Sequence, residues 1–344
     1  MDKKVTMKDI ATSLGLSINA VSLALNNKNG VGDQTRNQIL DTADQMGYFT
    51  ENMKYSTAFA NKNICVLTKT EFFRDTNFYG KVVLGVEQEA KLLGYDININ
   101  FVSDSMDTPA CVEQQRVCGI ILVGRISDEY IQKLMAYHLP MVMADHVSLH
   151  VPLDSIMTDN KHGAYQITGL LVEKGFTKIG FFGDFHYSMS VKERFFGYQE
   201  GISLLPFLKS YPEIVEYSLR YSVVEDVEQH VIEHNTAKII ERIQSIEMMP
   251  EALVCSNDVA AIQVMRALDK MGYKVPQDIS VVGFDDIEFS TICIPKLTTV
   301  HVRKESMGKA AVQKLLWRME HHDKPHENTI LSVQIVERDS VRNL

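Results

Sequence analysis

The chain has 344 residues, of which 45% are hydrophobic and 23% are charged. Because single hydrophobic cores stop growing at about 250–300 residues, we expect a small module beside a larger, two-lobed core. No apolar run reaches the roughly 18 residues that a membrane span needs, and the first residues lack the apolar stretch of a secretory signal. The composition therefore predicts a globular, cytoplasmic protein without a membrane partner.

The net charge of −9 is unevenly divided along the chain. The first 62 residues hold seven Lys or Arg against six Asp or Glu, a net charge of +1, so the remainder carries −10. This asymmetry has the direction expected of a nucleic-acid-binding head on an acidic body. It is far weaker than the excess of a strongly basic DNA module, so charge alone does not assign the function.

Three segments with helical spacing of apolar residues occupy the first fifty positions. The first begins at Thr6, which forms a capping-box-like start with Asp9, and Gly15 supplies a tight turn. Ser17 can cap the second helix, and the third is predicted over 33–46. This is helix–turn–helix spacing, and three such helices can close a minimal core.

The same stretch resembles the head of the lactose-repressor (LacI/GalR) family, whose pattern reads T-x-x-D-[IV]-A, G-[LV]-S-x-x-x-V-S-x-x-L-N, T-R and G-Y. Fifteen positions match in order: Thr6, Asp9, Ile10, Ala11, Gly15, Leu16, Ser17, Val21, Ser22, Leu25, Asn26, Thr35, Arg36, Gly47 and Tyr48. The resemblance implies a transcriptional regulator, usually a repressor, that binds double-stranded operator DNA as a homodimer.

In this family the second helix enters the major groove, so the resemblance implies base-edge contacts for Ile18, Asn19 and Leu23. Asn19 can pair with an adenine edge and Ile18 can contact a thymine methyl group. The family usually has Arg where this chain has Leu23, which puts the usual operator in doubt. The expected phosphate contacts, which fix register without reading sequence, are Thr6, Ser17, Ser22, Asn26, Thr35 and Arg36. For Ser22 and Thr35, an ordinary cap or a solvated side chain is an equally good interpretation.

Residues 49–63 are predicted to link the head (1–48) to the core (64–344). The family places a hinge helix here that inserts a leucine pair into the minor groove. This chain lacks the usual Pro-Asn opening and has no leucine at the wedge position. Met53, Tyr55 and Phe59 are apolar candidates for a wedge that kinks DNA, and an ordinary tether explains them equally well.

Short apolar runs alternate with amphipathic helical stretches beyond residue 64. Strands are predicted at 64–67, 97–101, 119–123, 140–144, 179–182, 253–255 and 279–283, and helices at 78–93, 164–174 and 259–271. This alternation predicts an α/β fold with parallel sheets, which bind ligands at the carboxyl ends of their strands.

This region resembles the periplasmic-binding-protein-like core of the same family. The motifs that carry the resemblance are 159–164 (DNKHGA), 175–179 (GFTKI), 194–198 (RFFGY), 256–258 (SND), 279–286 (ISVVGFDD), 297–300 (LTTV) and 337–340 (ERDS). The resemblance implies two lobes joined by three chain crossings. We expect lobe one near 64–160 and 300–326, and lobe two near 161–299 and 327–344.

The resemblance implies ligand contacts at Asp145, Arg194, Asn257 and Asp285. An Arg donor fork, carboxylate acceptors and an amide suit the vicinal hydroxyls of a sugar or sugar derivative. Five aromatic side chains can stack on a sugar ring: Phe72, Phe73, Phe78, Tyr79 and Phe284. For each of them alone, core packing is the better interpretation. Asp258 and Asp286 can equally cap helices or turns, and Trp317 is expected to pack.

Other classes of protein are poorly supported. The chain has no GxSxG, P-loop, HExxH or post-strand GxGxxG pattern and no histidine pair with metal spacing, so we expect no catalytic residue, metal or cofactor. The five cysteines are odd in number without a CxxC pair, which favours buried free thiols. A cytosolic solute-binding sensor with altered DNA binding, or a regulator that responds to a nucleobase or a protein corepressor, remains as an alternative.

Overall fold

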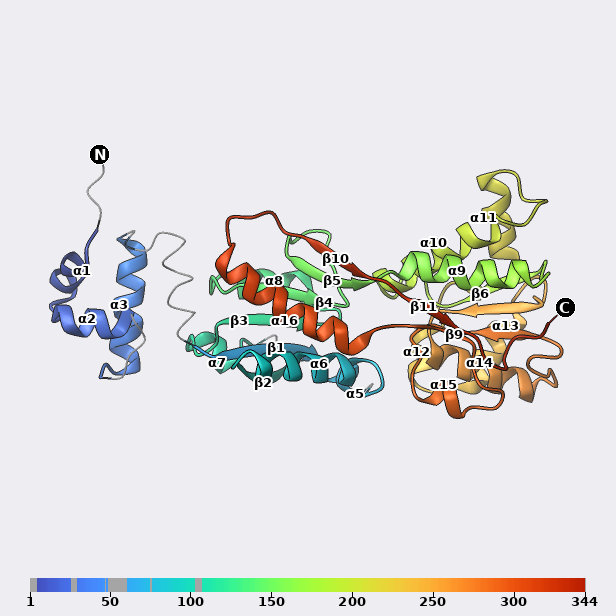
Figure 1. The fold of residues 1–344 in the computed structure, drawn as a ribbon, viewed down its shortest axis with the longest axis horizontal. Helices are drawn as coiled ribbons and strands as arrows, with labels where there is room; N and C mark the ends of the chain where they lie inside the picture. The colour runs from blue at the N-terminus through green and yellow to red at the C-terminus, as the bar shows by residue number, and fades with distance from the viewer. Residues whose placement is uncertain are drawn as a thin grey trace.

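The fold is that of a computed structural model, which describes residues 5–25, 30–46, 48, 61–74, 76–102 and 107–343. Figure 1 shows three bodies along the long axis: an all-helical head, then two α/β lobes. This arrangement agrees with the predicted fold class.

The head is a three-helix unit built from α1 (Met7–Leu14), α2 (Ile18–Leu25) and α3 (Asp33–Gln45). Each helix places its apolar stripe in one small core. The buried members of that core are Ile10, Ala11, Val21, Ala24, Leu25, Ile39, Ala43 and Tyr48. All three helices contact one another, so the head has a core of its own.

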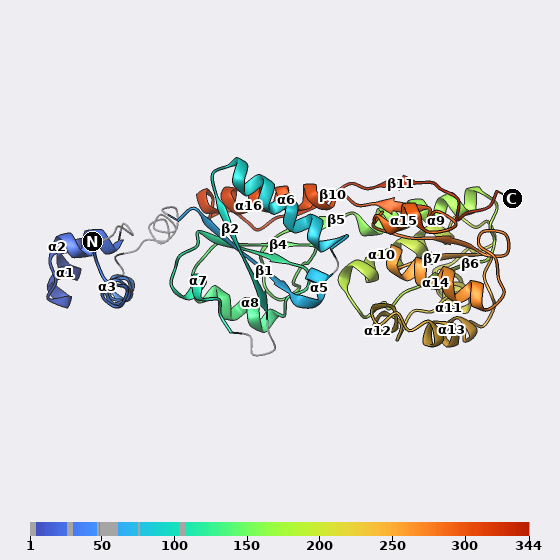
Figure 2. The same ribbon diagram turned by 90° about the horizontal axis from the view of Figure 1, so that it is seen from below.

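Lobe one is an entirely parallel sheet with the strand order β10-β5-β4-β3-β1-β2. Its strands are β1 (Asn63–Lys69), β2 (Asp96–Val102), β3 (Gly119–Val123), β4 (Met141–Ala144), β5 (Asp154–Thr158) and β10 (Asn328–Leu331). Its helices are α5 (Thr70–Arg74), α6 (Tyr79–Leu92), α7 (Ala110–Glu113), α8 (Asp128–Met135) and α16 (Lys304–Glu320). Figure 2 shows α6 and α16 on one face of the sheet and α7 and α8 on the other.

Lobe two holds a parallel sheet in the order β6-β7-β8 and a short antiparallel pair, β9 with β11. The strands are β6 (Ile179–Phe182), β7 (Ala252–Cys255), β8 (Ser280–Val282), β9 (Thr299–His301) and β11 (Gln334–Val336). The helices are α9 (Asn160–Glu173), α10 (Met189–Ile202), α11 (Tyr211–Arg220), α12 (Glu228–Ile232), α13 (Thr236–Gln244), α14 (Asp258–Lys270) and α15 (Phe289–Ile292).

The chain passes between the lobes three times: from β5 to α9, from β9 to α16, and from β10 to β11. The expected division at 326/327 is wrong for residues 328–331, because β10 pairs with β5 of lobe one. Residues 300–301 likewise lie in lobe two, because β9 pairs with β11 there. Each of these strands is only three or four residues long, and none forms the apolar run by which buried strands were predicted.

The lobes pack helices closely where glycine removes a side chain. A Cβ atom on Gly85 of α6 would lie 2.1 Å from the carbonyl oxygen of Glu305 in α16, and one on Gly308 would lie 2.0 Å from that of Val82. The two helices therefore approach backbone to backbone over the lobe-one sheet. None of the helices in the described part of the chain combines the length and apolar character needed to cross a membrane.

Candidate functional site

Two caps set the geometry of the head. The side chain of Thr6 accepts a hydrogen bond from the Asp9 backbone N–H, and the Asp9 carboxylate accepts one of 2.8 Å from the Thr6 N–H. Gly15 ends α1 in the left-handed region at φ 66°, where glycine carries no steric penalty. The Ser17 hydroxyl then accepts a bond of 3.1 Å from the Ala20 N–H at the start of α2. The turn between the helices is thereby held at both ends.

The outer face of α2 carries the residues predicted to read bases. Ile18 is 51% exposed, and Asn19 beside it is exposed as well. Leu23 is only half-buried, and a Cβ atom on Gly30 would lie 3.2 Å from its Cδ1 atom. Ile18 and Asn19 are therefore presented more fully than Leu23.

The predicted phosphate contacts differ in their surroundings. Thr6 and Ser17 are exposed and cap the starts of α1 and α2. Ser22 and Thr35 are half-buried. Arg36 donates to the carbonyl oxygens of Leu23 at 3.4 Å and Ala24 at 3.2 Å, where α2 ends. Arg36 thus supports the end of α2, and its contact with phosphate stays a prediction. The predicted contact Asn26 and the wedge candidates Met53, Tyr55 and Phe59 lie outside the described residues.

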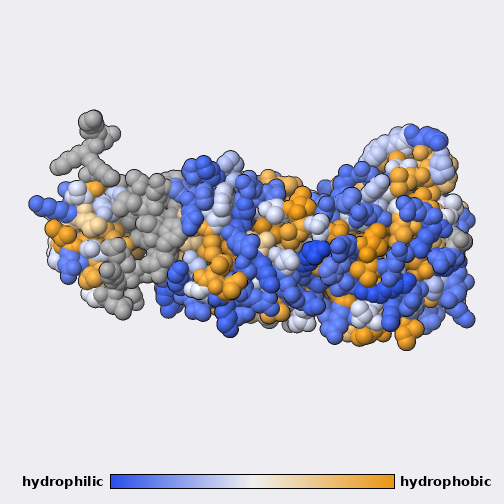
Figure 3. All heavy atoms as spheres, in the orientation of Figure 1, coloured by the Kyte–Doolittle hydropathy of each residue, from blue (hydrophilic) through white to orange (hydrophobic). Residues whose placement is uncertain are grey.

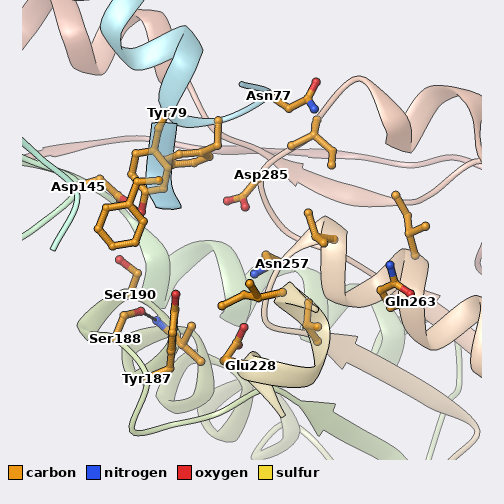
Figure 4. A pocket seen from close by; sticks show the side chains of 18 of the residues that line it. Asn77, Tyr79, Asp145, Tyr187, Ser188, Ser190, Glu228, Asn257, Gln263 and Asp285 are labelled. Atoms are coloured by element: carbon orange, nitrogen blue, oxygen red, sulfur yellow. Dashed lines mark hydrogen bonds between the residues drawn. The ribbon is translucent and has the colours of Figure 1, made fainter. Parts of the chain in front are cut away.

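A cavity of about 1070 Å³ lies between the two lobes (Figure 4). It is lined by all five residues expected to contact ligand: Phe78, Asp145, Arg194, Asn257 and Asp285. Three of them lie just after strands: Asp145 is the first residue after β4, Asn257 the second after β7 and Asp285 the third after β8. Strand ends of both sheets therefore meet at the cavity, as parallel sheets predict.

Within the described part of the chain, Asp145 has one unsatisfied carboxylate oxygen in the cavity wall. Its Oδ2 atom accepts a hydrogen bond of 3.0 Å from the Tyr79 hydroxyl, whereas its Oδ1 atom is buried without a partner among the described residues. Burial raises the pKa of Asp145 to about 7, with Arg194 opposing this shift and Asp285 adding to it. The carboxyl group can therefore accept a further hydrogen bond from a bound molecule.

Arg194 is held by three partners in lobe two. Its Nε atom donates to Asn160 Oδ1 at 2.9 Å, Nη1 to the Ser256 carbonyl at 2.6 Å, and Nη2 to Asp285 Oδ1 at 3.1 Å. The guanidinium also lies 3.9 Å from the ring centroid of Phe284. A guanidinium has five N–H donors, so two remain without a partner in the described structure.

The motif at 159–164 positions Arg194. Asp159 caps α9 by accepting a bond of 3.2 Å from the His162 N–H, and Asn160 supplies the acceptor for Arg194. A Cβ atom on Gly163 would lie 2.9 Å from the Phe284 ring, so glycine lets that ring lie beneath the guanidinium. Phe284 is only 1% exposed, in agreement with core packing as the preferred interpretation of this side chain: it supports Arg194 and does not stack on a ligand.

Of the neighbouring acidic and amide side chains, one faces the cavity and another holds a loop in place. Asn257 Oδ1 caps α14 through a 2.8 Å bond from Ala260 N–H, which leaves its amide N–H groups to face the cavity. Asp258 is buried and accepts bonds from Ile287 N–H at 2.9 Å and the Ser290 hydroxyl at 2.6 Å. Asp258 therefore holds the loop after β8 in place.

Asp286 also has a structural role. Its carboxylate accepts bonds from Arg338 at 2.5 Å and His301 at 2.8 Å. The ammonium of Lys304 at the start of α16 donates to the Asp285 carbonyl, although burial lowers the pKa of this lysine. These contacts connect the loop that carries Asp285 to the crossing between the lobes.

Several cavity residues had no motif to predict them. Glu228 of α12 is 3% exposed, accepts a bond of 3.0 Å from the Ser256 hydroxyl, and has a pKa raised by burial. Arg125 reaches across the lobes to donate to the Tyr187 carbonyl at 2.7 Å. Figure 4 shows Tyr79 and Asp145 on one side of the cavity, with Glu228 on the other. The described residues contain no group of three His, Cys, Asp or Glu side chains arranged to hold a metal ion.

The cavity has an apolar extension toward the edge of lobe two. Its walls come from α12, α14 and α15, and the aliphatic and aromatic members are Val231, Ile232, Val259, Ile262, Phe289 and Ile292. Phe72 and Tyr79, whose ring centroids are 4.9 Å apart, line the opposite part with Phe78. The cavity therefore combines a charged centre with apolar walls, as ligand sites of small molecules do.

Comparisons with known proteins agree with this geometry. Residues 6–51 match bacterial regulatory proteins of the lacI family, and residues 168–341 match the periplasmic binding protein-like domain. The chain is 26% identical over 353 residues to the HTH-type transcriptional repressor PurR of Mannheimia succiniciproducens, covering 98% of this chain and 99% of that one.

Solved structures show the same fold. A transcriptional regulator CelR–cellobiose complex aligns with a TM-score of 0.65 at 21% identity over 98% of this chain and 100% of the other. A lac repressor dimer bound to operator and the anti-inducer ONPF aligns with a TM-score of 0.63 at 23% identity, over 98% of this chain and 99% of the other.

Proposed function

Because the chain belongs to the lacI family of bacterial regulatory proteins, and is thus a DNA-binding transcriptional regulator with a ligand-binding core, we propose that it is a repressor whose effector occupies the inter-lobe cavity. The observation that carries the proposal is the cavity itself: five residues expected to bind ligand line one space of about 1070 Å³. In this proposal residues 1–48 bind DNA, 49–63 form the hinge, and the remainder senses the effector. The protein acts in the cytoplasm, where bacterial operators lie.

The effector is a sugar or sugar derivative. Donors from Arg194 and Asn257 and acceptors from Asp145 and Asp285 meet in one polar centre, which suits adjacent hydroxyl groups. Aromatic rings at Phe72, Phe78 and Tyr79 offer surface for the apolar face of a sugar ring. The bound cellobiose of the CelR complex is a carbohydrate in a protein of the same fold.

A nucleobase is the second candidate effector. It is supported by the PurR relatives, which are 26% to 29% identical to this chain. A planar base can lie against the same aromatic rings, and Asp145 can accept from a ring N–H or an exocyclic amine. The two candidate ligands differ in that a sugar offers adjacent hydroxyl groups to the polar centre and a nucleobase does not.

The head binds operator DNA through α2. Ile18 and Asn19 lie on its exposed face, where they can meet base edges in the major groove. Leu23 contributes an apolar contact, and Thr6, Ser17, Ser22, Thr35 and Arg36 with Asn26 fix the register through phosphates. Met53, Tyr55 or Phe59 supplies the minor-groove wedge.

The working unit is a homodimer. Large apolar side chains are exposed on both lobes: Leu84 and Ile99 on lobe one, and Phe289, Ile292 and Ile294 on lobe two. Figure 1 places α6, β2 and α15 along the same long edge, and Figure 2 shows α6 and α15 on the same side of the molecule, so one partner can cover both patches. Figure 3 shows hydrophobic surface at the lobe-two edge near α15. Pairing along this edge would set two α2 helices about 34–36 Å apart over a palindromic operator.

Effector binding acts through the three crossings. Closure of the lobes on a ligand moves β9–α16 and β10–β11 relative to the sheet that receives the linker, and couplings of this kind are typically about 1–3 kcal/mol. The cavity binds its ligand without transforming it.

A thermal-shift panel tests the proposal. Preferential binding to the folded state raises Tm, so sugars, sugar phosphates and nucleosides are compared at matched concentrations with the full chain. We expect a sugar or sugar derivative to raise Tm and to change operator binding in a gel-shift titration. A shift with nucleosides alone would transfer the proposal to the second candidate, and a ligand that raises Tm without altering DNA binding would contradict the coupling.

A further inference from the structure

Two of the five cysteines face one another in lobe one. The Sγ atoms of Cys65 and Cys111 lie 3.8 Å apart, although 46 residues separate them along the chain. Cys65 is on the strand β1 and Cys111 on the one-turn helix α7. The amide nitrogen of Asn100 on β2 lies 3.6 Å from both sulfur atoms. The pair is thus a cluster built from three separate elements, which the effector cavity does not include.

The two sulfur atoms differ in exposure and acidity. Cys65 is fully buried, whereas Cys111 is partly exposed. The hydrogen bond with Cys65 and the Asn100 amide hold the pKa of Cys111 below its usual value, and the same hydrogen bond together with burial raises the pKa of Cys65. A reachable thiolate beside a buried thiol is the arrangement of an oxidant-sensitive pair, in which one sulfur is attacked and the other resolves.

We propose that Cys65 and Cys111 form a reversible disulfide when the protein meets a hydroperoxide. The Cys111 thiolate attacks the terminal oxygen of the hydroperoxide: an S–O bond forms, the O–O bond breaks, and the other oxygen leaves, after protonation, as an alcohol, or as water where the oxidant is hydrogen peroxide. The Cys65 sulfur then attacks the sulfenic sulfur of Cys111. An S–S bond forms, the S–O bond breaks, and hydroxide leaves as water with the Cys65 proton. Two thiols lose two electrons, which reduce the peroxide.

The geometry allows the second step. A disulfide needs sulfur atoms about 2.05 Å apart, so the present separation of 3.8 Å must close by less than 2 Å. Cys111 occupies a helix of only four residues, which a local adjustment can move. Intracellular disulfides are usually transient or redox-sensing, so a pair of this kind fits an intracellular regulator without a structural disulfide framework.

The remaining cysteines are differently placed. Cys118 packs with Val312 and Leu315 in the cluster on the α16 side of the sheet, whereas Cys65 belongs to the cluster on the α7 and α8 side. Cys255 is buried in lobe two, and Cys293 is half-buried there. Burial raises the pKa of each of these three thiols. They therefore serve as internal controls.

The helix α7, which carries Cys111, lies at the end of lobe one nearest the head (Figure 1). The Asn61 amide, two residues before β1, donates a bond of 2.8 Å to the Gln115 carbonyl just after α7. The Arg116 N–H in turn bonds to the Cys111 carbonyl at 2.8 Å. The residues just before β1 are therefore already hydrogen-bonded to the residues just after α7. A disulfide would add a covalent link between β1, the strand that follows the linker, and α7.

Peptide mapping tests the proposal on the full chain. The protein is treated with a few equivalents of hydrogen peroxide, free thiols are blocked with N-ethylmaleimide, and trypsin is added. Cleavage after Lys62, Lys69, Lys91 and Arg116 places Cys65 in peptide 63–69 and Cys111 in peptide 92–116. We expect these two peptides to be cross-linked, with a loss of two hydrogen atoms, and to separate after dithiothreitol. Oxidation that leaves both peptides unlinked, or links either to another cysteine, would overturn the proposal.

Single variants identify the roles of the two sulfur atoms. In Cys65→Ser, Cys111 is expected to stop at the sulfenic acid and to be labelled by dimedone, whereas in Cys111→Ser the peptide 63–69 stays unmodified. The matched control Cys118→Ser retains the cross-link. Dimedone labelling of Cys65 in Cys111→Ser at the rate seen for Cys111 would contradict the assignment of Cys111 as the attacking thiolate. Should Cys65→Ser fail to fold, the cross-link in the unaltered protein still shows whether the disulfide between Cys65 and Cys111 forms.

Discussion

The guanidinium of Arg194 donates a 3.1 Å hydrogen bond from Nη2 to Oδ1 of Asp285, and both side chains are almost fully buried at the cavity wall. Two residues from different motifs, 91 positions apart, thus form one binding group. The pair is fixed from behind by Phe284 and Asn160, so its spare donors are already oriented before a ligand arrives.

Replacing Arg194 by Lys is expected to impair effector sensing. Lysine keeps the charge but loses the planar fork that reaches Asn160, Ser256 and Asp285 together. We expect the concentration of the ligand selected by the thermal-shift panel that gives half-maximal response to rise at least about tenfold, which corresponds to ~1.4 kcal/mol. Operator binding without ligand, measured by fluorescence anisotropy, should stay within about twofold. An unchanged response would remove Arg194 from the ligand site.

Gly163→Ala should reach the same site indirectly. The added Cβ would lie 2.9 Å from the Phe284 ring, and overpacking of this kind costs about 1–3 kcal/mol. Displacement of the ring would loosen Arg194 and weaken ligand binding. Gly169→Ala on the same helix is the matched control, because its Cβ would meet only Leu204 at 3.4 Å. Replacing a helical glycine there should leave the protein equally stable or up to ~1 kcal/mol more stable. Equal urea midpoints and ligand affinities for the two variants would contradict the role of Gly163.

Asp145 should make stability depend on pH. Its pKa is raised to about 7 in the folded chain, from an ordinary value of 3.8, so the folded state holds the proton more tightly than the unfolded state. The free energy of unfolding should therefore fall as pH rises from about 4 to about 7. Asp145→Asn removes this contribution and should flatten part of the slope in urea titrations. Asp258, whose pKa is also raised to about 7 by burial, keeps its own contribution in that variant. Superimposable pH profiles for the variant and the parent protein would refute the assignment.

Asn19→Ala and Arg36→Ala should separate recognition from support in the head. Asn19 is exposed on α2, so its replacement should relax base preference at one position, by about 1–3 kcal/mol of discrimination, without changing the stability of the head. Arg36 holds the Leu23 and Ala24 carbonyls, so its loss should weaken the helix end and lower the Tm. Selection from a randomised operator pool and a thermal melt measure the two effects. Unaltered base preference in Asn19→Ala would argue against a base contact.

Ile294→Glu is expected to disrupt the dimer. This side chain is 95% exposed beside α15, on the edge proposed to pair with a second copy, and a buried charge at an interface without a partner is costly. Leu219→Glu is the control, since Leu219 is 52% exposed on α11, near the opposite edge of the molecule in Figure 1. Sedimentation equilibrium should detect monomers for the first variant and dimers for the second. A dimer unaffected by Ile294→Glu would exclude this edge.

The sequence alone determined those parts of the protein that depend on local patterns. The capping residues Thr6 and Ser17 and the left-handed Gly15 are read from neighbouring residues, and so the head helices were predicted almost to their ends. Strands 119–123 and 179–182 form apolar runs, and the structure has β3 and β6 at those positions. Asn257 and Asp285 lay within recognisable motifs and Asp145 directly after the predicted strand 140–144, and all three line the cavity.

Only the tertiary structure decided how distant groups meet. The pairing of β10 with β5 joins segments about 170 residues apart, and a four-residue strand carries no signal for its partner. Phe284 proved to lie beneath Arg194, Glu228 entered the cavity from an unpredicted helix, and Cys65 came to face Cys111. In each case the contact joins elements that approach only when the sheets are assembled. Side-chain neighbours across such distances are fixed by packing, which residue type and spacing do not specify.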